Sequence, residues 1–130
     1  MNIGQASAAS RVSAKLIRYY EATGLLPLPA RSDSNYRDYG PDDVHRLIFV
    51  RRARELGFEM DSIRELLGLW ADRNRSHPEV RKVAARHVAE LEAQAARLQE
   101  MIATLRGLVA SCKHGRRQDC PIISELETWQ

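Results

Sequence analysis

The chain has 130 residues, 44% of them hydrophobic, and a formal net charge of +3. A chain of this length can bury one modest core, or a small head joined to an extended element. It has no apolar run long enough to span a membrane, and its N-terminus lacks the basic and apolar segments of a secretory signal. We therefore expect a cytoplasmic protein, in which a structural disulfide is disfavoured.

Arginine residues are concentrated in residues 1–75. A mildly basic balance permits nucleic-acid binding without proving it, and a solvated face that keeps the protein soluble explains the arginines equally well. The sequence contains no recognisable Ser/His/Asp set, pair of catalytic carboxylates or glycine-rich phosphate loop. We therefore do not expect an enzyme.

Residues 3–24 have the pattern of two short helices joined by a tight turn. Ser13 is a suitable N-cap, because its hydroxyl can accept a hydrogen bond from a free amide at the start of a helix. Gly24 supplies the left-handed residue that ends a helix. The pattern predicts a helix-turn-helix whose recognition helix spans residues 13–23.

Residues 25–40 lack a helical period and contain turn-forming residues, including Pro27 and Pro29. Asn35 suits the tip of a small β-hairpin, because asparagine tolerates positive φ better than most residues. Such a hairpin would form a wing beside the recognition helix. The alternative is a surface loop whose tyrosines pack locally.

Two further helices are expected in the head. Pro41 suits the first turn of one of them, which Gly57 would end. Asp61 or Ser62 would cap the next helix. Trp70 belongs to the apolar stripe of that helix and is expected to pack in the core.

A long helix is predicted from an N-cap at Ser76 to about Ser111. At about 1.5 Å per residue, its roughly 35 residues extend about 50 Å, too far for a small head to cover. We expect a second copy to cover its apolar seam in an antiparallel coiled coil, rather than a fold-back within one chain. Positions of the seam alternate by three and four residues: Ala84, His87, Leu91, Gln94, Leu98, Met101, Leu105 and Leu108.

The only two cysteines, Cys112 and Cys120, are separated by seven residues and followed by a proline. Two thiolates suit a two-coordinate site for a soft monovalent ion such as Cu(I), whereas structural zinc needs four ligands. His114 lies inside the loop and can supply a third ligand. Three alternatives stay open: a disulfide, two inert thiols, and a redox switch.

In its order of elements and in its motifs, the chain resembles the MerR family of transcription regulators. Within that family it is most similar to the copper-efflux regulator branch, which senses Cu(I), Ag(I) and Au(I). The matching motifs cover essentially the whole chain: Met1–Gly4, Ser13–Glu21, Gly24–Leu26, Arg31–Ser32, Tyr36–Arg37, Arg51–Phe58 and Cys112 with Asp119–Ile122.

The resemblance implies a homodimer bound to double-stranded promoter DNA. An ion held by Cys112 and Cys120 would make the dimer bend and untwist that DNA, so that RNA polymerase can transcribe metal-efflux and resistance genes. The wing pattern itself exposes Arg31 for a phosphate. By position, the resemblance assigns further DNA contacts to Lys15, Arg18, Tyr19, Tyr36, Arg37 and Arg54.

The expected fold is mainly α, with a winged helix-turn-helix DNA-binding domain over residues 1–75. A dimerisation helix over residues 76–111 and a metal-binding loop with a short helix over residues 112–130 follow. Divalent sensors of the family place a Cys at the start of the dimerisation helix and monovalent sensors usually a Ser, but this chain has His77 beside Ser76. A neutral imidazole can bind Zn(II) or Cu(II). A divalent-metal regulator, a redox regulator and a metal carrier therefore remain alternatives.

Overall fold

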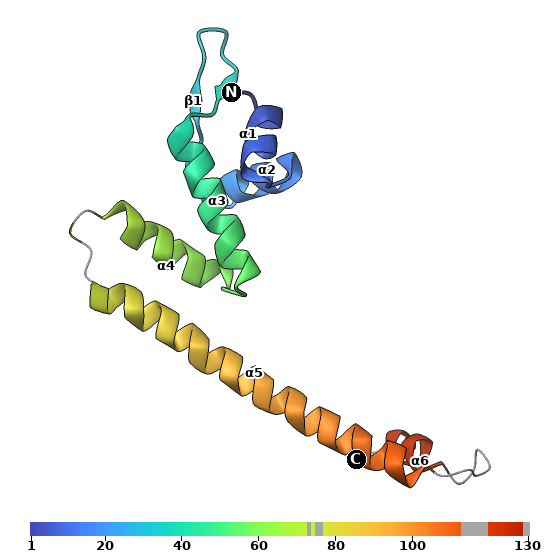
Figure 1. Ribbon diagram of the computed structural model, residues 1–130. Helices are drawn as coiled ribbons and strands as arrows, with labels where there is room; N and C mark the ends of the chain where they lie inside the picture. Colours follow the sequence, from blue (N-terminus) through green and yellow to red (C-terminus); the bar gives the residue numbers. More distant parts are fainter. Residues whose placement is uncertain (73, 75–76, 113–119, 129–130) are drawn as a thin grey trace. The chain divides into compact units, whose positions relative to one another are not determined.

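A computed structural model describes residues 1–72, 74, 77–112 and 120–128 (Figure 1). As expected, the described chain is mainly helical. Residues 1–84 and 85–130 form two compact units, and the longest helix begins in the first and continues into the second. The elements are α1 (Ile3–Ser10), α2 (Ala14–Ala22), β1 (Ala30–Arg31), β2 (Arg37–Asp38), α3 (Pro41–Glu55), α4 (Met60–Ala71), α5 (His77–Ser111) and α6 (Pro121–Glu127).

Helices α1 and α2 form the predicted helix-turn-helix. The hydroxyl of Ser13 accepts a hydrogen bond of 3.1 Å from the amide of Leu16, so the predicted cap is confirmed. Gly24 follows α2 with φ +76°, a conformation that side chains with a Cβ rarely adopt. Local backbone preferences therefore fix both ends of the recognition helix.

Strands β1 and β2 form an antiparallel hairpin in which Arg31 faces Arg37. Asn35 has φ +64° in its turn, as predicted for the tip. The side chain of Tyr36 is 75% exposed, whereas that of Tyr39, just after β2, is buried. The segment is therefore a hairpin wing, and only one of these two tyrosines packs inward.

Helix α3 has Pro41 in its first turn, as predicted, and Gly57 lies just beyond its end with φ +84°. The predicted start of α4 is wrong. That helix begins at Met60 with Glu59 as its N-cap, so Asp61 and Ser62 lie within its first turn. Phe58 and Met60 pack against the core, and this packing sets the start of the helix in place of a polar cap.

The core of the first unit lies where α1 packs against α2 and α3, with α4 packed against α3 (Figure 1). Leu47 of α3 and Ile63 of α4 are almost completely buried. Trp70 departs from its predicted place in this core, because it is 38% exposed and stacks on Phe49 with ring centroids 4.9 Å apart. Trp70 keeps its place in the apolar stripe of α4 by stacking on the half-buried ring of Phe49, and its indole stays partly exposed.

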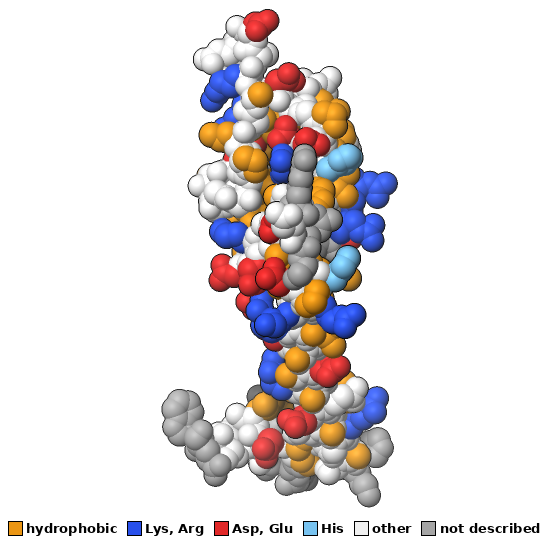
Figure 2. Space-filling view, turned by 90° about the vertical axis from the view of Figure 1, so that its left-hand side faces the viewer, with side chains coloured by type: hydrophobic (Ala, Val, Ile, Leu, Met, Phe, Trp, Pro, Cys, Tyr) orange, Lys and Arg blue, Asp and Glu red, His pale blue; other side chains and the backbone are white. Residues whose placement is uncertain are grey.

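The part of α5 within the second unit carries a row of apolar side chains between charged ones, as Figure 2 shows. Leu91, Leu98, Met101 and Leu105 of the predicted seam are between 41% and 58% exposed. His87 of the seam is buried and Leu108 is half-buried. In the described part of the chain, no helix is both long enough and apolar enough to cross a membrane.

We expect Leu47→Ala to lower the free energy of unfolding by about 2–5 kcal/mol, because the change removes buried methyl groups and leaves a cavity. Leu28, which is 63% exposed, provides the matched control, and Leu28→Ala should shift stability by less than about 0.5 kcal/mol. Urea titrations followed by circular dichroism at one protein concentration measure both. Equal effects of the two substitutions would contradict the described core.

Candidate metal centre and nucleic-acid interface

The two cysteines lie at facing ends of two helices. Cys112 directly follows α5, and its amide donates to the carbonyl of Leu108 at 3.0 Å. Cys120 is the N-cap residue of α6. Their Sγ atoms are 3.5 Å apart, within hydrogen-bond reach of one another. The structure thus brings together the two residues that the sequence singles out as metal ligands.

The two thiols have different tendencies to ionise. The backbone amide of Ile123, at the start of α6, lowers the pKa of the Cys120 thiol, and the hydrogen bond from Cys112 lowers it further. The same hydrogen bond to Cys120 raises the pKa of Cys112. Cys120 is therefore the thiol that ionises more readily, and its thiolate accepts a hydrogen bond from the Cys112 thiol.

Of the additional ligands proposed from sequence, only His77 is among the described residues. Ser76 and His114 lie outside the described residues. His77 is the exposed first residue of α5 and belongs to the first compact unit. Among residues 1–72, 74, 77–112 and 120–128, no group of three or more His, Cys, Asp or Glu side chains is placed to hold a metal ion.

Four of the seven expected DNA contacts surround one shallow hollow between α2 and the wing. Arg18 extends from α2, and Arg31, Tyr36 and Arg37 come from the hairpin. Lys15 and Tyr19 are also exposed on α2. A cluster of three guanidinium groups beside an exposed tyrosine can hold phosphate oxygens and the sugar edge of a duplex.

Arg54 lies apart from that hollow. It is exposed on α3 and lines a second hollow together with Arg11 and Arg51. Arg11, which is not among the DNA contacts expected from the sequence, occupies the tight turn between the two helices with φ +63°.

Arg37 differs from the other basic residues because a buried carboxylate holds it. Its Nη1 atom is 2.6 Å from Oε2 of Glu21, whose side chain is 3% exposed. The hydroxyl of Tyr39 donates a second bond of 2.6 Å to Oε1 of Glu21. Burial and this bond raise the pKa of Tyr39, so the hydroxyl remains protonated and serves as the donor.

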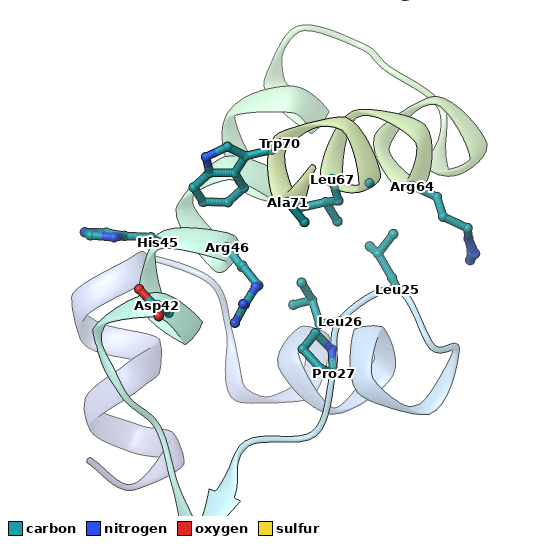
Figure 3. Close-up of a pocket in the computed structure, with 11 residues that line it drawn as sticks. Leu25, Leu26, Pro27, Asp42, His45, Arg46, Arg64, Leu67, Trp70 and Ala71 are labelled. Atoms are coloured by element: carbon teal, nitrogen blue, oxygen red, sulfur yellow. The ribbon is translucent and has the colours of Figure 1, made fainter. Parts of the chain in front are cut away.

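A further pocket of the head lies among α3, α4 and residues 25–27 (Figure 3). Leu26 and Leu67 contribute to its apolar walls, and Arg46 extends toward Pro27. The ring of His45 points away from the hollow. Among the described residues, those that line the pocket include no cysteine, serine or threonine that could act as a nucleophile beside a base.

Comparison with known proteins agrees with the sequence and the fold. Residues 1–69 match the family model described as the MerR HTH family regulatory protein, and residues 44–108 match the one described as MerR, DNA binding. Heavy metal-dependent transcription regulator 2 of Rhizobium meliloti (strain 1021) is 54% identical over 126 residues, which cover 97% of this chain and 86% of the relative. The regulator CueR of Salmonella typhimurium (strain LT2) is 36% identical over 126 residues, covering 97% of this chain and 91% of the relative.

A solved structure shows the same architecture. The transcription regulator PbrR691 from Ralstonia metallidurans CH34, in complex with lead(II), superposes with a TM-score of 0.86 at 32% identity, covering 97% of this chain and 98% of that one. Its likeness extends over both the head and the long helix. The chain therefore belongs to the MerR family of transcription regulators, which bind promoter DNA and are not enzymes.

Proposed function

We propose that this chain is a metal-responsive transcription activator whose inducer is Cu(I), Ag(I) or Au(I) bound by Cys112 and Cys120. The observation that carries the proposal is the 3.5 Å approach of the two sulfur atoms where α5 ends and α6 begins. The names of the relatives support it, since one is called heavy metal-dependent and another is the regulator CueR.

The donor set fits a soft monovalent ion. Thiolates favour such ions, and two sulfurs on opposite sides of one ion lie about 4.6 Å apart if each bond is about 2.3 Å. The 3.5 Å separation belongs to a pair that shares a proton. Replacing that proton with an ion therefore requires the sulfur atoms to separate by about 1 Å.

The ionisation order suggests how an ion is captured. Because its pKa is lowered, Cys120 presents the thiolate that meets the ion first. The bound cation then favours ionisation of Cys112, whose pKa is raised while the ion is absent. Binding consequently releases protons and becomes stronger as the pH rises.

The response reaches DNA through a homodimer. We assign residues 1–75 to DNA binding, residues 76–111 to antiparallel dimerisation and residues 112–130 to the ion site. A second copy would cover the exposed seam residues Leu98 and Met101. The ion-bound dimer would then bend and untwist promoter DNA so that RNA polymerase can start transcription in the cytoplasm.

The sulfur geometry also favours a second candidate, a redox-responsive regulator. An oxidant such as a peroxide would take two electrons and two protons from the pair, and a bond would form between Cys112 Sγ and Cys120 Sγ. A divalent ion is a further alternative, because the similar structure of PbrR691 contains lead(II). In that case His77 of a second copy would add a nitrogen ligand or hydrogen-bond the loop.

Substitution of either cysteine tests the ion site. Cys112→Ser or Cys120→Ser should weaken Ag(I) binding more than about 100-fold, because one of two ligands is lost, while duplex binding is retained. Competition titration with Ag(I) and transcription from a template that carries the bound duplex measure the two effects. Both assays contain a strong reductant. The proposal would be contradicted if the wild-type dimer bound no monovalent ion under these conditions, or if it responded only to an oxidant.

The ionisation order makes a second prediction. Iodoacetamide at neutral pH should modify Cys120 several-fold faster than Cys112 in the reduced, ion-free protein, because the group with the lowered pKa keeps its thiolate to lower pH. Cys112→Ala removes the thiol donor and should slow the reaction of Cys120. Peptide mass spectrometry measures both rates. Cys112 is the more exposed thiol, so faster labelling of Cys112 would show that access decides reactivity and that the order is wrong.

The role of His77 is tested by replacing it with serine, the residue that monovalent sensors usually have at this position. His77→Ser should leave the Ag(I) response unchanged and weaken any Zn(II) or Pb(II) response by about 10- to 100-fold. Transcription in vitro with a panel of metals compares the variant with wild type, and Lys82→Ser, farther along α5, provides a control. If His77→Ser loses the Ag(I) response and Lys82→Ser keeps it, the histidine belongs to the monovalent site.

A further inference from the structure

We propose that Glu21 is a positioning residue for DNA binding, which locks the wing against the recognition helix and sets Arg37 in place for a phosphate. This inference rests on the DNA-binding part of the proposed function and not on its metal response. Glu21 lies in the last turn of α2, whereas Arg37 forms part of β2 and Tyr39 follows it. One carboxylate thus accepts a hydrogen bond from Tyr39 at Oε1 and forms an ion pair with Arg37 at Oε2, an oxygen that has no hydrogen-bond partner in the described structure.

The position of Glu21 is unfavourable for a carboxylate unless such donors are present. Its side chain is 3% exposed, and a buried charge is costly to desolvate. It also lies near the C-terminal end of α2, where the helix dipole disfavours negative charge. The hydrogen bond from Tyr39 and the ion pair with Arg37, each at 2.6 Å, offset these effects, so the carboxylate favours a wing that stays close to α2.

The charges around the hollow explain why the contact between Glu21 and the wing affects DNA binding. Arg18, Arg31 and Arg37 line the same hollow and repel one another. Glu21 contributes the opposing charge on the side of Arg37 that faces the protein. The ion pair with Glu21 involves the Nη1 atom of Arg37, and a guanidinium has further N–H donors that can bind a phosphate.

The sign of the effect separates positioning from simple electrostatics. Removing a negative charge near DNA should strengthen binding if only net charge matters. If Glu21 positions Arg37, the same change should weaken binding, because Arg37 and the wing are released from α2. Asp33, an exposed carboxylate in the turn of the wing, offers the matched change of charge without the buried contacts.

The experiment uses the full chain and a duplex that the wild-type protein selects from a randomised pool. Its dissociation constant is measured over a range of salt concentrations without added metal, for wild type, Glu21→Gln, Asp33→Asn and Arg37→Gln. Thermal melting identifies a temperature at which every variant is folded. If the wild-type protein selects no duplex, DNA binding itself is refuted, whatever the comparison of the Glu21 variants gives.

We expect Glu21→Gln to weaken binding about 10-fold and to reduce the salt slope by about 1, as Arg37→Gln does, because one phosphate contact is lost. Asp33→Asn should bind as tightly as wild type or more tightly. Binding by Glu21→Gln that equals that of Asp33→Asn would overturn the proposal, since destabilisation alone leaves the salt slope of folded protein unchanged.

A variant with shorter reach covers the case in which Glu21→Gln does not fold. Glu21→Asp keeps the charge but withdraws the carboxylate by one methylene group. If the proposal is right, folded Glu21→Asp binds the selected duplex more weakly than the wild type does. Binding equal to that of wild type would overturn it.

Discussion

The apolar seam of α5 is the constraint on which the other features depend. In the described chain, Leu91, Leu98, Met101 and Leu105 stay between 41% and 58% exposed on a helix of 35 residues. Burial of a fully exposed side chain of this kind is worth about 1.5–3 kcal/mol. About half of that remains for each of these half-exposed residues, so covering the four adds about 3–6 kcal/mol, comparable with the lower end of the stability of a small domain, about 5–15 kcal/mol. In the proposed dimer, folding of α5 and association of two copies are therefore one process.

The geometry of the proposed ion site depends on that helix. Cys112 is held by the hydrogen bonds of the last turn of α5, whereas Cys120 belongs to α6, a helix of seven residues with no fully buried side chain. A short helix with little buried area opens or shifts at low cost. When an ion replaces the shared proton, α6 is thus the element expected to move, and α5 is the fixed side of the site.

The features predicted well from sequence are those that local chemistry decides. Ser13, Gly24 and Asn35 act through their own backbone preferences or nearest amides. The two cysteines that the sequence singles out lie with their Sγ atoms 3.5 Å apart, and their role as metal ligands stays a prediction. The start of α4 was missed because packing of Phe58 decides it. The bond between Glu21 and Arg37 was missed because a carboxylate on a polar-looking helix carries no sign of burial, and its partner lies on an element that only the folded wing brings near.

In the proposed regulator, a signal from the cysteines would be transmitted along α5, which is one continuous helix from His77 to Ser111. Its early residue Val83 is buried in the first compact unit, and its last turn positions Cys112 in the second. Allosteric couplings in proteins are typically about 1–3 kcal/mol, and a thiol pair that exchanges a proton for an ion can supply such a difference between two arrangements of the helix ends. If the recognition helix and the wing move together, this difference in free energy can change the shape of the bound DNA. If the wing moves independently of the recognition helix, the difference would be lost in movement of the wing. On this proposal, Glu21 would hold the wing to the recognition helix, so that the two move as one body.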